Sequence, residues 1–203
     1  LAAHGVSPVD SLDDVDKGAV VLIRSHGVGP DVYEQADQKE LKVIDATCPH
    51  VKKAQQDAKN IVEKGEKLII VGEKSHPEVI SISQWGANHA IIIDREEEAE
   101  KIPFCDSMGV VVQTTFSQEQ FKRIAAILQR KTNHLDVHMT ICTATQQRQQ
   151  AAIELAGHVD AMIVIGGRHS SNTQKLYEIC LKECKNTFYI QTLADLDPDS
   201  VSS

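Results

Sequence analysis

The 203-residue sequence has few aromatic side chains, an excess of negative charge and no long apolar run. Aromatic residues make up 4% of the chain, so stacking against nucleic-acid bases has few platforms. The net charge of −8 argues against binding to a phosphate backbone, which depends on a basic face. No apolar run approaches the roughly 18 residues of a membrane-spanning helix. The first residues also lack the basic and apolar regions of a secretory signal.

The five cysteines are an odd number at irregular spacing, which argues against a disulfide framework and favours a cytoplasmic protein. There is no initiator methionine, and the residues before Gly5 resemble the last turn of a helix. Residues 197–200 read as a loop that leads into a further segment. We therefore expect the chain to be part of a longer protein.

One order of signals, an apolar strand followed by a cysteine and a helix, occurs twice in the chain. Cys48 lies within the first copy, and Cys142 lies within the second, after an expected strand that begins at His138. Cys48 precedes Gly72 by 24 positions, and Cys142 precedes Gly166 by 24 positions. Each glycine closes an apolar run, and a polar cluster follows within four residues. The chain therefore contains an internal repeat of about 94 residues with one cysteine per unit.

Short β-branched runs alternate with helical stripes along the whole chain. This alternation is typical of an α/β fold with parallel sheets and right-handed crossovers. Arg95–Lys101 reads as a charged surface segment between such elements. The other expected strands are 20–23, 42–45, 68–71, 90–93, 109–112, 161–165 and 187–190.

The cysteines fall into two groups by their surroundings. Cys48 and Cys142 are expected at helix N-termini, where a thiolate is favoured and can bind zinc or an iron–sulfur cluster. Isolated cysteines are also common as small buried apolar residues, so both interpretations stay open for this pair. Cys180 and Cys184 belong to an apolar helical stripe and are expected in the core, and Cys105 lies in an expected loop.

Polar clusters stand where strands lead into helices, which is where an open parallel sheet presents its ligand site. Helix N-termini bind anions, and imidazole, hydroxyl and amide groups donate to phosphate oxygens. A lone loop histidine usually has no such role, but several converging donors favour a phosphate or diphosphate pocket. The candidate donors are His26, His76, Ser170, Ser171 and Asn172.

Two further residues are candidates for proton transfer. Glu78 stands in the same turn as His76, so partial burial beside an anion would suit it as a proton donor. It also fits an exposed carboxylate at a helix start. Thr114 ends its strand and either relays a proton through its hydroxyl or caps the turn.

Six motifs together resemble the 4-hydroxy-3-methylbut-2-enyl diphosphate reductases. The resemblance runs through essentially all 203 residues in the right order, and no single motif would be specific alone. The motifs are Arg24–Ser25–His26–Gly27–Val28, Asp45–Ala46–Thr47–Cys48–Pro49, Ser75–His76–Pro77–Glu78–Val79, Gln113–Thr114–Thr115–Phe116–Ser117, Ile141–Cys142–Thr143–Ala144–Thr145 with Arg148–Gln149, and Ser170–Ser171–Asn172–Thr173.

The resemblance implies three similar α/β units around a central cavity, with pseudo-threefold symmetry in the complete protein. On this basis we divide the chain into a partial first unit (1–47), a second unit (48–141) and a partial third unit (142–203). It also implies an iron–sulfur enzyme of the non-mevalonate isoprenoid pathway, which removes the substrate hydroxyl as water and gives isopentenyl and dimethylallyl diphosphate. A ferredoxin or flavodoxin is the implied electron donor, and no nucleic acid or membrane partner is expected.

Motif by motif, the resemblance assigns Cys48 and Cys142 as ligands of a 4Fe-4S cluster that takes three cysteines. It assigns the diphosphate to the five candidate donors named above, and proton transfer to Glu78 with help from Thr114 beside the substrate. The family's first cysteine motif has no match in this sequence, so we expect the third ligand to be absent and the chain alone to be inactive. A zinc-dependent hydrolase and a non-catalytic binding protein for a phosphorylated metabolite are the alternatives.

Overall fold

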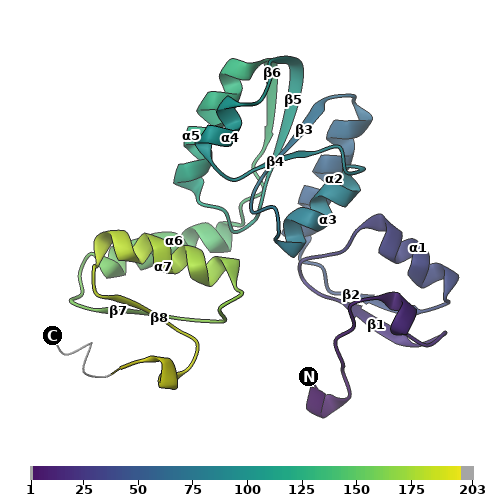
Figure 1. The fold of residues 1–203 in the computed structure, drawn as a ribbon, viewed down its shortest axis with the longest axis horizontal. Helices are drawn as coiled ribbons and strands as arrows, with labels where there is room; N and C mark the ends of the chain where they lie inside the picture. Colours follow the sequence, from purple (N-terminus) through teal and green to yellow (C-terminus); the bar gives the residue numbers. More distant parts are fainter. Residues whose placement is uncertain (1, 198–203) are drawn as a thin grey trace.

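The computed structural model describes residues 2–197, which form three separate parallel sheets joined by helices. A two-stranded sheet pairs β1 (Val20–Ile23) with β2 (Lys42–Asp45), and another pairs β7 (Met162–Ile165) with β8 (Thr187–Ile190). Between them lies a four-stranded sheet in the order β4-β3-β5-β6 (Figure 1). Its strands are β3 (Lys67–Val71), β4 (Ile91–Ile93), β5 (Cys105–Val112) and β6 (Thr132–His138).

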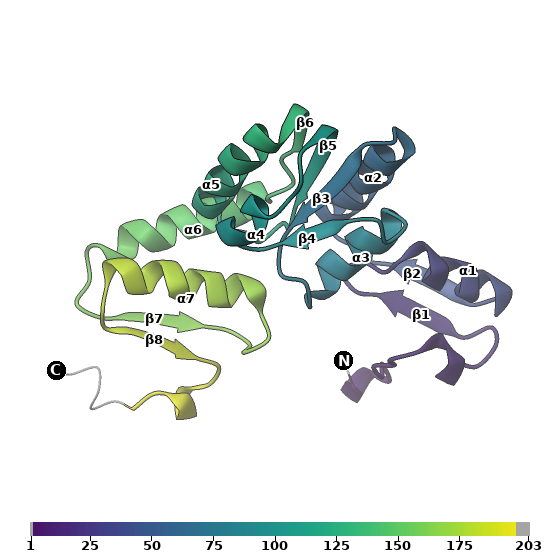
Figure 2. The same cartoon turned by 45° about the horizontal axis from the view of Figure 1, so that its top comes forward.

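The helices connect successive parallel strands, as the expected α/β class requires. Short 3-10 turns lie at Ala2–His4, Leu12–Asp14, Gln129–Lys131 and Leu193–Asp195. The helices are α1 (Pro30–Gln38), α2 (Pro49–Glu63), α3 (Pro77–Trp85), α4 (Glu96–Glu100), α5 (Gln118–Leu128), α6 (Thr143–Ala156) and α7 (Ser171–Glu183). In Figure 2, α6 and α7 lie along one side of the β7–β8 pair, and α1 lies along the β1–β2 pair. Among the described residues, no helix combines the length and apolar character needed to cross a membrane.

The four-stranded sheet is buried on both faces because its central strands are continuous apolar runs. Ile69 and Val71 of β3 belong to the apolar cluster that includes α4 and α5 residues, whereas Leu68 and Ile70 face the cluster formed with α2 and α3. This period of two is the geometry of a strand. On the α2 side, Gly109 leaves the space that Ile61 fills, since a Cβ at Gly109 would lie 2.5 Å from the Ile61 side chain.

The two-stranded sheets keep one apolar face in contact with solvent. In the first sheet Leu22 is 52% exposed and Ile44 is 55% exposed, and in the last sheet Ile165 is 68% exposed. Cys180 and Cys184 are buried beside Ala156 and Val164, so their expected core position is confirmed. The proposed division after residues 47 and 141 remains a prediction about folding units.

Two local expectations were wrong, and a third, the charged surface segment 95–101, is confirmed. The strand before Cys142 ends at His138, because the Thr140 hydroxyl then takes the hydrogen bonds of the Val112 backbone in place of a strand neighbour. The charged segment 95–101 contains α4, in which the glutamates are exposed or half-buried and Ala99 is fully buried. Cys105 is the first residue of β5 and does not lie in a loop.

Candidate functional site

Cys48 and Cys142 occupy equivalent positions in the fold. Cys48 is the N-cap of α2, and Cys142 is the N-cap of α6. Each cysteine amide donates to a carbonyl just beyond a neighbouring strand, that of Ser25 at 3.0 Å and that of Thr114 at 3.0 Å. Both thiols are half-buried and free, and neither caps its helix through a side-chain hydrogen bond. The two sulfur atoms therefore stand at matching helix starts and remain open to a further partner.

The two candidate histidines contact each other across the first and second units. The ring centroids of His26 and His76 are 5.3 Å apart in an edge-to-face arrangement. Burial lowers the pKa of both imidazoles, and the nearby Arg24 charge acts in the same direction. Nδ1 of His76 accepts a hydrogen bond from the Glu78 amide at 3.2 Å, so its Nε2 carries the proton and can donate. Nδ1 of His26 is buried without a hydrogen-bond partner within the described part of the chain.

The Glu78 carboxyl is held by Thr114, which comes from the end of β5. Oε1 of Glu78 accepts from the Thr114 amide at 2.6 Å, and Oε2 accepts from the Thr114 hydroxyl at 2.8 Å. The Glu78 side chain is 2% exposed. Burial raises the pKa of Glu78, and the two hydrogen bonds from Thr114 oppose this effect. Glu78 is therefore a buried acid in fixed orientation and does not behave as an exposed helix-start carboxylate.

These contacts form one continuous path between the two cysteine turns. Cys142 bonds to Thr114, Thr114 bonds to Glu78, and Glu78 bonds to His76. His76 packs on His26, and the neighbouring Ser25 carbonyl bonds to the Cys48 amide. Residues that were selected separately along the sequence thus meet at the carboxyl ends of β1, β3 and β5.

The turn before α7 brings the remaining donors. Ser170 is the N-cap of α7, and its hydroxyl accepts from the Thr173 amide at 3.3 Å. Gly166 makes room for this turn, because a Cβ there would lie 2.3 Å from the Thr173 hydroxyl. Oδ1 of Asn172 is buried without a hydrogen-bond partner in residues 2–197. This oxygen can only accept, so a water or another donor would satisfy it, whereas an anion would be bound by donors such as the free amides of the helix start.

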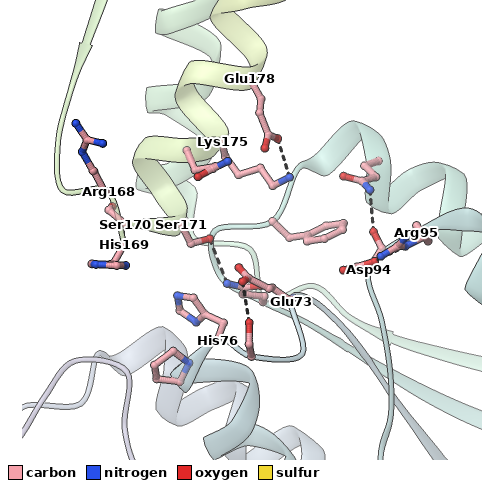
Figure 3. A pocket seen from close by; sticks show the side chains of 16 residues that line it. Glu73, His76, Asp94, Arg95, Arg168, His169, Ser170, Ser171, Lys175 and Glu178 are labelled. Carbon is pink, nitrogen blue, oxygen red and sulfur yellow. Dashed lines mark hydrogen bonds and ion pairs between the residues drawn. The ribbon is translucent and has the colours of Figure 1, made fainter. Parts of the chain in front are cut away.

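A cavity of about 800 Å³ lies between the second and third units. Figure 3 shows His76 and Glu73 on one side of it and Ser170 and Ser171 of the α7 start nearby. The structure therefore places three of the candidate donors in one cavity. The remaining site candidates do not line it: His26, Asn172, Glu78, Thr114, Cys48 and Cys142.

Sequence reasoning missed several residues of this cavity. Gln113, which is 2% exposed, donates through Nε2 to the Ser171 hydroxyl at 3.3 Å. Lys175 lies over the Phe116 ring, with its Nζ 5.9 Å from the centroid, and pairs with Glu178 at 2.9 Å. Gln113 stood inside a recognised motif, but no local pattern signals its partner 58 positions away.

The family model described as "LytB protein" matches residues 1–203 of the chain. The chain belongs to the LytB family. Among curated proteins, this LytB chain is 44% identical over 197 residues to the 4-hydroxy-3-methylbut-2-enyl diphosphate reductase of Alkaliphilus oremlandii, covering 97% of the chain and 70% of the relative. It is 46% identical over 193 residues to the reductase of Caldanaerobacter subterraneus subsp. tengcongensis, covering 94% and 67% respectively.

Solved structures agree with the α/β class of this LytB chain. The diphosphate reductase of Plasmodium falciparum superposes with a TM-score of 0.90 at 29% identity and covers 96% of the chain and 63% of that protein. A second structure, titled as the terminal enzyme of the non-mevalonate pathway, gives a TM-score of 0.63 at 36% identity over 96% of the chain and 70% of its own length. The chain thus spans roughly two thirds of the proteins that it resembles.

The LytB family uses a 4Fe-4S cluster, and the two matching thiols fit such a group. Both are free, half-buried and placed at equivalent helix starts, and thiolates are the ligands that hold these clusters. Within the described range, no group of three or more His, Cys, Asp or Glu side chains is arranged to hold a metal ion. This chain therefore offers two candidate ligands.

Proposed function

We propose that this chain carries the chemistry of 4-hydroxy-3-methylbut-2-enyl diphosphate reductase, the last step of the non-mevalonate isoprenoid pathway. Two electrons and two protons enter the reaction, the bond between carbon and the substrate hydroxyl breaks, and the oxygen leaves as water. The products are isopentenyl and dimethylallyl diphosphate. The observation that carries this proposal is the buried Glu78 carboxyl, fixed by Thr114 on the path that joins the two cysteine turns.

Glu78 and Thr114 have the geometry of a proton relay. The Thr114 hydroxyl donates to Oε2 of Glu78 in the structure, and when Oε2 is protonated this hydrogen bond runs the other way, from Oε2 to the hydroxyl, while Oε1 stays fixed by the Thr114 amide. The Thr114 hydroxyl is then free to pass its own proton to the departing substrate hydroxyl. Burial raises the pKa of Glu78 and so favours its protonated form, which is the form that can donate.

His26, His76 and the turn Ser170–Asn172 hold the diphosphate. His76 offers its Nε2 proton, and the α7 start offers free amides and hydroxyls. Burial lowers the pKa of both imidazoles and favours their neutral form in the free protein. The negative charge of a bound diphosphate favours their protonated form. Arg168 and Lys175 also line the cavity, where they pair with Asp195 and Glu178 respectively.

Cys48 and Cys142 supply two of the three cysteine ligands of a 4Fe-4S cluster, and the third comes from outside the motifs of this chain. When bound, the cluster would supply electrons and Lewis-acid assistance to the departure of the substrate hydroxyl. A ferredoxin or flavodoxin delivers the electrons, and the reaction takes place in the cytoplasm.

Purification without oxygen tests this proposal. We expect bound iron, a broad visible absorbance band and reductive dehydroxylation of the substrate by the protein as it occurs in the cell. Cys48→Ser and Cys142→Ser should lower the iron content, whereas Cys105→Ser, in β5, should not. A colourless protein with stoichiometric zinc would favour the hydrolase alternative, and a metal-free protein that still binds diphosphate would favour a binding protein.

A further inference from the structure

We propose that Gln113 is a positioning residue whose side chain joins the start of α7 to the turn after β3 and so orients Ser171 toward the anion site. We call the hydrogen-bonded group of Gln113, Thr115 and Ser171 the latch. The inference deepens the proposed function and rests on it for the identity of the anion. Gln113 acts through Ser171, and no contact between Gln113 and the substrate is required.

Both ends of the Gln113 amide are engaged. Oε1 accepts from the Glu73 amide at 2.9 Å, in the turn after β3. Nε2 donates to the Ser171 hydroxyl at 3.3 Å and to the Thr115 hydroxyl at 3.3 Å. The Thr115 and Ser171 hydroxyls are themselves 3.1 Å apart. One amide and two hydroxyls therefore form a closed triangle that joins the second and third units.

The backbone around Gln113 is shaped for this contact. The backbone amide of Gln113 donates to the Val71 carbonyl at 2.8 Å, which fixes the position from which the side chain extends. Gly72 leaves the space beside it, because a Cβ at this position would lie 2.8 Å from Cβ and 2.9 Å from Oε1 of Gln113. A larger residue at position 72 would push the side-chain amide of Gln113 away from Glu73. Glycine is therefore needed at position 72, at the end of β3, because the Gln113 side chain occupies the space that a Cβ would fill.

The latch matters because no shared sheet fixes the two units. In the described topology β6 belongs to the four-stranded sheet and β7 to the last pair, so no strand ladder runs from Gln113 to Ser171. Ser171 is the first residue of α7 and lines the same cavity as His76. Its hydroxyl direction is set by the triangle, and loss of a corner leaves it free to turn away from an anion beside His76.

Two variants and a matched control test the latch in the complete protein. Gln113→Met keeps the length of the side chain and removes its hydrogen bonds. Thr115→Val removes one hydroxyl of the triangle at a half-buried position, and it serves as the test if Gln113→Met does not fold. Thr132→Val is the control, because its buried hydroxyl bonds to the Asp106 carbonyl and takes no part in the site.

Deuterium uptake in the first turn of α7 reports on the latch directly. There the Gln174 amide bonds to the Ser170 carbonyl at 3.0 Å, and we expect its exchange to quicken in both test variants but not in the control. Affinity for inorganic diphosphate should fall about 3–10-fold, the scale of one lost hydrogen bond. The effect should appear in KM, with turnover at saturating substrate retained.

Unchanged uptake in α7 for both variants would overturn the latch. Faster uptake with unchanged diphosphate affinity would overturn its role in orienting Ser171. His76→Ala, measured in parallel, distinguishes the assignment of the anion site from the role of the latch. If His76→Ala weakens diphosphate binding and the latch variants do not, the proposed function stands and the latch fails. If His76→Ala has no effect, the anion site is assigned wrongly, and the exchange data still decide whether the latch exists.

Discussion

Replacing Glu78 with glutamine removes the transferable proton and keeps the local hydrogen-bonding pattern. One oxygen of Glu78 accepts from the Thr114 amide and the other lies 2.8 Å from the Thr114 hydroxyl, to which a protonated Glu78 can donate. Glutamine has one acceptor and one donor group in the same places. We therefore expect normal cluster content and substrate affinity, and turnover about 10²–10⁴-fold lower, the usual scale of general acid catalysis. This loss corresponds to about 3–5 kcal/mol in the activation free energy.

The same variant should also change how the free energy of unfolding depends on pH. Burial raises the pKa of Glu78 above its ordinary 4.5, so the folded protein binds this proton more tightly than the unfolded chain does. The stabilising contribution of Glu78 is complete below pH 4.5 and is lost as the pH rises through the folded pKa. Each tenfold difference in proton affinity is worth about 1.4 kcal/mol. Glu78→Gln should therefore gain stability relative to the wild type between pH 4.5 and neutrality.

Two measurements check this reasoning. Steady-state turnover with saturating reductant reports on the proton, and urea unfolding at several pH values reports on the linkage. Glu96→Gln is the control, because this α4 carboxylate forms an exposed ion pair with Arg123 and should change neither turnover nor the pH trend. Wild-type turnover in Glu78→Gln would place the proton donor elsewhere. A parallel pH dependence of stability in the two proteins would show that Glu78 is ionised in the folded state.

Other expectations concern the anion site and the packing of the second unit. His76→Ala should weaken diphosphate binding by about 1–3 kcal/mol, the scale of a charge-assisted hydrogen bond, and unchanged affinity by calorimetry would contradict the assignment. Gly109→Ala should lower the free energy of unfolding by about 1–3 kcal/mol, because the new Cβ would overlap the Ile61 side chain. Gly157→Ala, where the nearest atom to a new Cβ is 3.7 Å away, should stay within about 1 kcal/mol of the wild type, and equal urea midpoints for the two variants would refute the packing argument.

Much of the fold was predictable because its signals are local. Pro30, Pro49 and Pro77 each open a helix in the structure, as a fixed φ and a missing amide proton favour. The apolar runs before Gly72 and Gly166 are strands, and the α/β class follows from their alternation with helices. These features depend on a few neighbouring residues, which the sequence displays directly.

Elements that depend on distant partners were not predictable in the same way. Thr140 ends β6 because its hydroxyl meets the Val112 backbone 28 positions away, and nothing beside it in the sequence signals this. In α4 the glutamates lie on the surface as expected, but nothing beside Ala99 in the sequence signals its burial in the core of the second unit.

The sequence by itself determined which residue types stand at the ends of the strands, and the repeat showed that Cys48 and Cys142 are equivalent. Only the tertiary structure decided how these residues meet. Thr114 holds Glu78 across 36 positions, and Gln113 reaches Ser171 across 58 positions. For Glu78 and Thr114 the physical reason is that the parallel strands β3 and β5 place their carboxyl ends at one edge of a sheet, whatever the length of chain between them. Gln113 and Ser171 belong to units with separate sheets, so their contact depends on how those units pack. Both hydrogen bonds depend on distances of a few ångströms, which are set by tertiary packing.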